Sequence, residues 1–233
     1  MTDGKHHFLE MFSDRERIAN YADGPRRFTP GLEAVHRMTA ILLSDHAPAD
    51  AQVLVLGAGG GLELRWLAEA QPGWRFTGID PAGPMLDLAR IALGPDSGRT
   101  DLIEGYIEDA PEGPFDAATC LLTLHFLERE ERVRTLRDMH RRMKRGAALV
   151  VVHSSFPQEE PARARWLSRY AAFAVASGAD PQQVEQARAA VSASLALLDP
   201  QTDEECLSEA GFENVELFYA AFTWRGWVAR AAI

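Results

Sequence analysis

Short apolar runs alternate with helical patterns along the first two thirds of the chain. The apolar runs have the length of strands, and we predict strands at residues 52–57, 75–80, 100–105, 116–122 and 148–153. Between them lie patterns that predict helices at residues 61–70, 83–92 and 129–143. This alternation is typical of a doubly wound α/β fold, in which helices cover both faces of a parallel sheet.

The pattern changes in the last third of the chain. Residues 159–198 are rich in alanine and predict helices without a strand, the second of which begins at Asp180 and Pro181. Residues 202–211 then predict a capped helix, and residues 214–231 predict two adjacent strands.

Two helical segments outside the strand pattern are expected to form a lid. A capping pattern from Ser13 to Glu16 predicts a helix near the N-terminus. We expect this helix and the helices of residues 159–198 to lie over the carboxyl edge of the sheet, where doubly wound folds bind ligands. The alanine-rich helices could also pair two subunits, so we expect a homodimer.

Composition favours a single globular domain located in the cytoplasm. The chain has 233 residues, of which 46% are apolar and 25% charged, and this suffices for one domain with a substantial core. The longest apolar runs have only strand length, and the start MTDGKHHFLE lacks the apolar core of a signal peptide. Cys120 and Cys206 have neither metal-ligand spacing nor a disulfide framework, so we expect both to be buried thiols in a reducing compartment. We expect no association with a membrane.

The charge balance argues against a large nucleic-acid interface. The formal net charge is −10, whereas binding to a phosphate backbone depends on clustered Lys and Arg. Residues 128–145 are locally basic, with RRMKR at their end, but apolar side chains recur there on one helical face. We interpret the charged faces of this helix as solvated rather than as an RNA-binding patch.

A glycine cluster follows the first predicted strand. GAGGG at residues 57–61 fits the spacing GxGxG but not GxGxxG, because Leu62 occupies the sixth position. A strand, a glycine turn and a helix N-terminus can hold a nucleotide cofactor, since free N–H groups and the helix dipole point at the ligand. Asp80 ends the second strand, where its carboxylate could accept hydrogen bonds from a ribose or cap the next helix.

These motifs, taken in order, resemble those of class I S-adenosylmethionine (SAM)-dependent methyltransferases. The resemblance covers residues 30–233 and rests on VLVLGAGGG, FTGIDPAGPMLDLAR, EGYIED, FDAATCLLTLHFL and LSEAGFENVELFYAAFTWRGWVA. It implies a Rossmann-like seven-stranded sheet with a reversed last strand and a helical lid. Residues 1–233 would form a single domain, with a SAM-binding core of residues 30–157 and 200–233 and a lid and substrate region of residues 1–29 and 158–199.

The resemblance also implies which residues hold the cofactor. Gly57, Ala58 and Gly59 would lie under its methionine part, and Asp80 would hold the ribose. Pro81 and Met85 would flank the adenine, and Tyr106 and Ile107 would contact the adenine edge. The backbone of Leu121 would bind the methionine ammonium. Many relatives carry an acidic residue where Tyr106 stands. Glu108, Asp109 or a backbone carbonyl would then have to accept the adenine amino group here.

Within this class the chain most resembles the branch that includes carboxy-SAM synthase, an enzyme of tRNA wobble uridine modification. The segments FTPGLEAVHRM, LTLHFLEREER and AGF carry this resemblance. Arg188 falls where that branch keeps a carboxylate-binding arginine, but Leu32 and Leu121 replace a tyrosine and an asparagine. We therefore favour ordinary methyl transfer over carboxy-SAM synthesis. Arg188 would recognise an acidic acceptor if it faces the cleft, or lie in solvent.

Methyl transfer needs few catalytic groups. An in-line displacement depends on positioning and desolvation, and a general base is needed only if the acceptor is protonated. His125 follows the fourth strand and His153 ends the fifth, both at the carboxyl edge. They are the candidate bases, although either could simply shape the pocket. We expect no metal, because no Asp-Asp-Asn cluster follows the fourth strand.

The acceptor is expected to be a small molecule. An apolar acceptor pocket could be lined by Trp166, Tyr170, Phe173, Phe218, Tyr219, Phe222, Trp224 and Trp227, although a buried stripe shows the same helical spacing. A tRNA-directed methyltransferase and a SAM-binding regulator without turnover are the alternatives.

Overall fold

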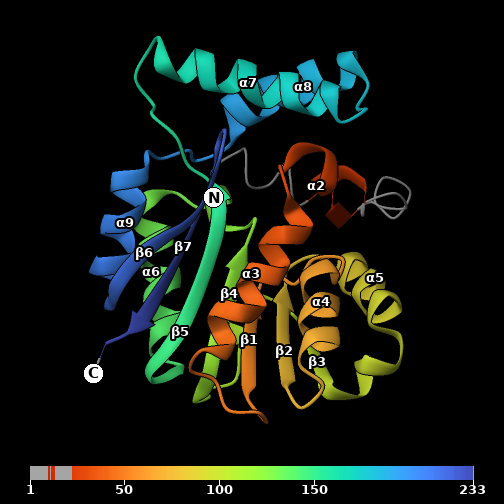
Figure 1. The fold of residues 1–233 in the computed structure, drawn as a ribbon, viewed down its shortest axis with the longest axis vertical. Helices are drawn as coiled ribbons and strands as arrows, with labels where there is room; N and C mark the ends of the chain where they lie inside the picture. Colours follow the sequence, from red (N-terminus) through yellow and green to blue (C-terminus); the bar gives the residue numbers. More distant parts are fainter. Residues whose placement is uncertain (1–9, 11, 14–22, 233) are drawn as a thin grey trace.

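The computed structural model describes residues 10, 12–13 and 23–232, and its centre is a seven-stranded sheet (Figure 1). The strands are β1 (Gln52–Leu56), β2 (Arg75–Asp80), β3 (Thr100–Glu104), β4 (Phe115–Leu121), β5 (Met143–Ser154), β6 (Phe212–Ala221) and β7 (Trp224–Ala231). They follow the order β3-β2-β1-β4-β5-β7-β6. Strand β7 is antiparallel to both neighbours, which confirms the predicted sheet with a reversed last strand.

Helices cover both faces of the sheet. One face carries α3 (Leu32–Ser44), α4 (Leu62–Ala70) and α5 (Gly83–Leu93), and the other carries α6 (Arg129–His140) and α9 (Pro200–Glu209) (Figure 1). Successive side chains of a strand point to opposite faces. In β1, accordingly, Val53 and Val55 join the core under α3 and α4, whereas Leu54 and Leu56 join the core under α6 and α9.

The boundary between α6 and β5 differs from the prediction. The predicted helix runs to residue 143, but α6 ends at His140 and β5 already begins at Met143. The Arg142 side chain is buried between these elements and donates hydrogen bonds to the carbonyl oxygens of Ala110 and Asp138. A sequence pattern that treats arginine as a solvent-facing residue cannot anticipate this turn.

Two helices lie over the carboxyl ends of the strands. They are α7 (Ala162–Ala176) and α8 (Pro181–Ser194), which pack against each other at the top of the molecule in Figure 1. The chain enters and leaves this pair through adjacent segments, since the Phe156 N–H donates to the Leu198 carbonyl at 3.2 Å. Both segments therefore connect the helix pair to the core at one place.

A short helix, α2 (Asp23–Phe28), lies beside this pair. The rings of Phe28 and Tyr170 are 5.4 Å apart, and the Trp224 indole N–H donates to the Phe28 carbonyl at 2.9 Å. The structure thus ties α2 both to α7 and to the sheet. The predicted capping pattern from Ser13 to Glu16 lies for the most part outside the described residues.

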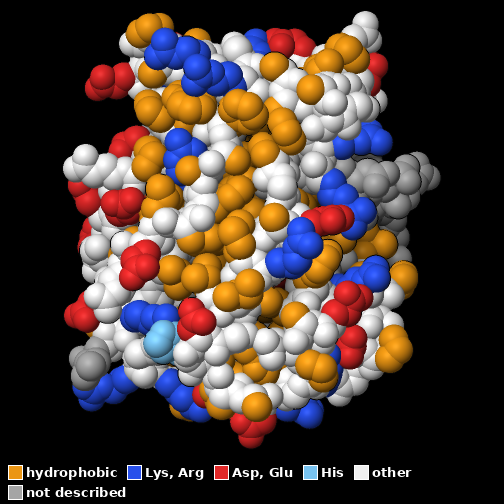
Figure 2. Space-filling view, viewed as in Figure 1, with side chains coloured by type: hydrophobic (Ala, Val, Ile, Leu, Met, Phe, Trp, Pro, Cys, Tyr) orange, Lys and Arg blue, Asp and Glu red, His pale blue; other side chains and the backbone are white. Residues whose placement is uncertain are grey.

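The surface carries charges of both signs. Figure 2 shows Lys and Arg side chains close to Asp and Glu side chains over much of one face, with apolar side chains between them. Among the helices of the described residues, none is long and apolar enough to cross a bilayer.

Candidate active site

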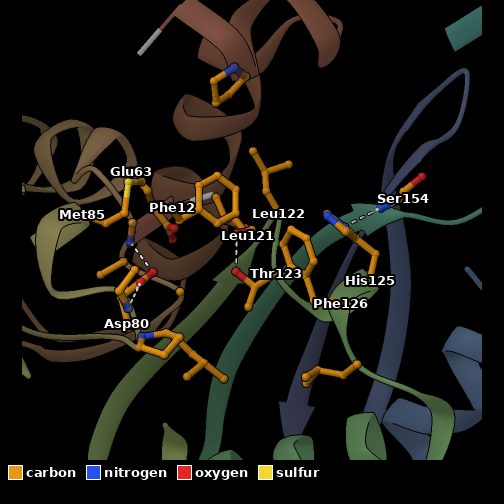
Figure 3. Close-up of a pocket in the computed structure, with 18 of the residues that line it drawn as sticks. Phe12, Glu63, Asp80, Met85, Leu121, Leu122, Thr123, His125, Phe126 and Ser154 are labelled. Atoms are coloured by element: carbon orange, nitrogen blue, oxygen red, sulfur yellow. Dashed lines mark hydrogen bonds between the residues drawn. The ribbon is translucent and has the colours of Figure 1, made fainter. Parts of the chain in front are cut away.

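A cavity of about 1300 Å³ opens at the carboxyl edge of the sheet, and residues of α7 and α8 contribute to its wall. Figure 3 shows part of its lining. Its floor is formed by the loops that follow β1, β2, β3 and β4. Helices α2 and α3 close one side, and residues of α7 and α8 close the top. The site thus lies where ligands bind in doubly wound folds.

The glycine turn after β1 forms one wall of this cavity. Gly57, Gly59 and Gly61 all have positive φ angles, of 78°, 49° and 78°, which L side chains rarely adopt. A Cβ atom on Gly57 would lie 1.9 Å from the Thr123 hydroxyl oxygen, and one on Gly61 would lie 2.7 Å from the Ala89 Cα. Glycine is therefore required at both positions, by the backbone and by its close neighbours.

Asp80 joins the glycine turn to the start of α5. Its two carboxylate oxygens accept hydrogen bonds from the N–H groups of Gly59 and Ala82, each at 2.9 Å (Figure 3). Ala82 is the N-cap residue of α5, so Asp80 supports that cap without being it. Burial raises the pKa of Asp80, and these two hydrogen bonds oppose the rise. Each oxygen keeps a lone pair that a ligand hydroxyl could use.

The other predicted cofactor residues also line the cavity. They are Ala58, Pro81, Met85, Tyr106, Ile107 and Leu121, together with Gly57, Gly59 and Asp80. Of the two acids proposed to replace the residue missing at Tyr106, Asp109 already accepts the Tyr106 N–H at 2.9 Å. The Leu121 carbonyl is also engaged, because it accepts the Thr123 hydroxyl at 2.9 Å (Figure 3).

His125 lines the cavity and its tautomer is fixed by the backbone. The Ser154 N–H donates to its Nδ1 at 3.3 Å, so in the neutral ring the proton resides on Nε2 (Figure 3). Burial, together with the nearby His153 and Arg132, holds the pKa of His125 well below its usual value. At neutral pH His125 is thus a neutral ring with an N–H donor.

His153 is placed differently from His125. It is 1% exposed, and the cavity wall does not include it. Its Nε2 lies 3.1 Å from Asp203 Oδ1, on the side of the sheet that α9 covers. Burial lowers the pKa of His153, which therefore belongs to a buried polar cluster behind the site.

That cluster was not predicted from the sequence. Arg132 of α6 forms a fully buried ion pair with Asp203, and it donates to the carbonyl oxygens of Leu127 and Ala196 at 3.2 and 2.7 Å. Because the Ala196 N–H in turn donates to the His125 carbonyl at 3.1 Å, the cluster supports the cavity wall. The only sequence signal was a single Arg in a charged helix, which resembles a solvent-facing residue.

Glu63 is a second residue that the sequence did not single out. It lies in the first turn of α4 and on the cavity wall, is 6% exposed, and its Oε1 has no hydrogen-bond partner (Figure 3). Burial raises its pKa to about 8, although the Thr119 hydroxyl opposes the rise. An acid in the first turn of a helix usually interacts favourably with the helix dipole. Its position in the sequence therefore does not indicate that it is buried.

Arg188 does not contribute to the cavity wall. Its guanidinium pairs with Glu185 on the same helix, with Nε 2.9 Å from the carboxylate, whereas Gln183 and Gln186 do line the cavity. Leu32 and Leu121, the two departures from the carboxy-SAM synthase pattern, both lie on the wall.

Only part of the predicted aromatic set lines the cavity. Tyr170 and Trp224 do so, while Phe218, Tyr219 and Trp227 pack against the two cores. Phe173 contacts Phe222, and Trp166 lies against Arg169. Within the described ranges, no group of three or more His, Cys, Asp or Glu side chains is placed to bind a metal ion.

Comparison with known proteins supports a single class. The family model described as "Methyltransferase domain" matches residues 53–146. The carboxy-SAM synthases of Idiomarina loihiensis and Actinobacillus succinogenes are 21% and 25% identical to the chain, over 93% and 95% of it and 91% and 94% of their own lengths.

A solved structure shows the same fold. Human N-acetylserotonin methyltransferase in complex with SAM superimposes with a TM-score of 0.60 at 18% identity. The match covers 96% of this chain but only 59% of the human one.

The match to the methyltransferase domain and the similarity to carboxy-SAM synthases, together with the fold and the cavity, support a class I SAM-dependent methyltransferase. Within this class the chain is related to the carboxy-SAM synthase branch. The residues present fit SAM, since the glycine turn leaves no room for a Cβ at Gly57 and the wall holds the buried acid Glu63, whose Oε1 has no hydrogen-bond partner.

Proposed function

We propose that the chain transfers a methyl group from SAM to an uncharged, largely apolar small molecule. The observation that carries this proposal is the upper part of the cavity, where Phe28, Tyr170, Val191, Leu195 and Trp224 form the wall. Apolar and aromatic walls with few polar groups are typical of small-molecule sites.

The lower part of the cavity would hold the cofactor. Gly57, Ala58 and Gly59 would lie under the methionine part, and Asp80 would accept hydrogen bonds from the ribose hydroxyls. Pro81, Met85, Tyr106 and Ile107 would surround the adenine, with the Leu121 backbone near the ammonium. Because Asp109 is already engaged, we propose Glu108, which lines the cavity, as the acceptor for the adenine amino group.

Bound SAM supplies an electrophilic methyl group, so the chain itself has to align the two reactants and exclude water. The glycine turn and Asp80 fix one reactant, and the apolar wall beneath α7 and α8 desolvates the other. His125 would donate its Nε2–H to the acceptor and orient it, because the Ser154 N–H already occupies Nδ1. We propose a structural role for His153, given its burial beside Asp203.

A carboxy-SAM synthase-like activity is the second candidate, and the relatives support it. The cavity supports it less well. Arg188 pairs with Glu185, and the wall carries more acids than bases: Glu63, Asp80, Glu108, Asp109 and Glu131 line it together with Arg134. Such a wall favours cationic and uncharged ligands over a carboxylated cofactor.

The placement of the basic residues in and directly after α6 argues against tRNA as the acceptor. Arg132 and Arg142 are buried, and Arg129 and Arg141 pair with Glu209 and Asp138. Few of these charges remain for phosphate groups, which is consistent with a small-molecule acceptor.

The proposal is tested with methyl-labelled SAM, incubated in parallel with a small-molecule fraction of a cell extract and with bulk tRNA. We expect label in a small molecule that becomes heavier by one methylene, in the wild type and in Arg188→Met but not in Asp80→Ala. Label in tRNA, a carboxylated form of SAM by mass spectrometry, or no transfer despite SAM binding would each contradict it.

A further inference from the structure

Glu63 is an acid placed where a negative charge is costly. Its side chain lies on the cavity wall directly after the glycine turn, 6% exposed and with Oε1 unpartnered. A buried carboxylate without a hydrogen bond or counter-ion is strongly disfavoured relative to the neutral acid. Burial accordingly raises the pKa of Glu63 to about 8.

The groups around Glu63 do not supply a compensating charge. His36, on the facing helix α3, is also buried, and burial together with Arg26 lowers its pKa to about 4, so that it is neutral at neutral pH. On β4, the Thr119 hydroxyl is uncharged, and burial raises the pKa of the Cys120 thiol, which stays neutral. Asp80, across the glycine turn, is another acid.

In the part of the chain that the structure describes, the cations on α4 and α5 are engaged elsewhere. On α4 itself Arg65 pairs with Glu69, and on α5 Arg90 pairs with Asp87, all with exposed side chains. Among the described residues, these neighbours of Glu63 supply no positive charge, and a cationic ligand in the cavity would supply one.

We propose that Glu63 is a proton-loaded counter-ion, which is a neutral acid in the free enzyme and gives up its proton when the cationic methionine end of SAM enters the cavity. This inference rests on the methyltransferase function proposed above. SAM carries a sulfonium and an ammonium, and either charge beside Glu63 would stabilise the carboxylate. The proton passes to solvent, no covalent bond in SAM changes in this step, and SAM affinity rises with pH up to the pKa of free Glu63.

Calorimetric titration of SAM near neutral pH, repeated in buffers of different ionisation enthalpy, counts the protons released. We expect close to one proton for the wild type and for Glu69→Gln, a control on the exposed face of α4. Glu63→Gln should bind SAM without releasing this proton. A second titration with S-adenosylhomocysteine separates the two charges, because equal release assigns the ammonium and smaller release assigns the sulfonium.

The proposal is overturned if the wild type binds SAM without releasing a proton, or if Glu63→Gln releases as many protons as the wild type. Failure of the wild type to bind SAM would instead refute the proposed function.

The pH dependence of unfolding without ligand provides a second readout. Because the pKa of Glu63 is raised in the folded state, the wild type should lose stability as pH rises from the unfolded pKa of 4.5 to about 8. Glu63→Gln should lack this loss, and identical pH profiles of the two proteins would also overturn the proposal.

Discussion

At the scale of single residues, the site depends on one close approach between two loops. Gly57 follows β1 with a φ of 78°, and the Thr123 hydroxyl occupies the space that a Cβ would fill. Thr123 is itself held by the Leu121 carbonyl at 2.9 Å. The glycine turn and the loop after β4 therefore keep a fixed separation, and any ligand that lies over both depends on it.

Replacing Gly57 with Ala should destabilise the fold by about 2–4 kcal/mol, because an alanine with positive φ also overlaps Thr123. Gly146→Ala is the matched control: its φ of 74° is similar, but no atom lies within 4 Å of the added Cβ. The control should lose about 1 kcal/mol in urea unfolding and bind SAM normally, whereas Gly57→Ala should bind at least tenfold more weakly. Equal losses in the two variants would show that the Thr123 contact does not matter.

At the scale of elements, a buried polar cluster joins four segments behind the cavity. Arg132 of α6 pairs with Asp203 of α9, Asp203 lies beside His153 of β5, and Arg132 also holds the carbonyl of Ala196, in the segment that returns from α8. Burial raises the pKa of Asp203, but the neighbouring His153 and Arg132 outweigh burial and hold this pKa below its usual value. The segments that support His125 thus depend on one ion pair.

Arg132→Met should cost about 3–5 kcal/mol, because it leaves Asp203 buried without its partner. Arg137→Met, on an exposed face of the same helix, removes only one hydrogen bond, to the Glu209 carbonyl, and should cost less than about 1 kcal/mol. Urea unfolding of both variants measures the difference. Similar small losses would mean that the buried pair contributes little to the fold.

At the scale of the whole molecule, the sequence predicts the sheet better than the polar interior. Strand-length apolar runs and the glycine turn predict β1 to β5, and the pattern of residues 214–231 predicts β6 and β7. The reversed direction of β7 followed only from the resemblance. Hydrophobic patterning treats charged residues as solvent-facing, so it missed Arg132, Arg142 and Glu63, all of which are buried. It also could not separate His125, which lines the cavity, from His153, since both lie at the carboxyl ends of strands that finish at the same edge.

The position of Arg188 shows the same limit within the lid. Its place in the chain matches the carboxylate-binding arginine of the resembling branch, yet side-chain direction on a helix decides which residues face the cavity. In the structure Gln183 and Gln186 face it, and Arg188 pairs with Glu185. Chain position alone therefore does not define the acceptor.

Calorimetric titration of SAM tests the central claim, that the cavity at the carboxyl edge holds SAM between the glycine turn and Asp80. The wild type and the exposed control Asp50→Ala should bind SAM in the low micromolar range or tighter, and Asp80→Ala should lose about 2–4 kcal/mol of binding free energy. Binding of a nicotinamide dinucleotide in place of SAM, or equal SAM affinity in Asp80→Ala and the wild type, would contradict the account.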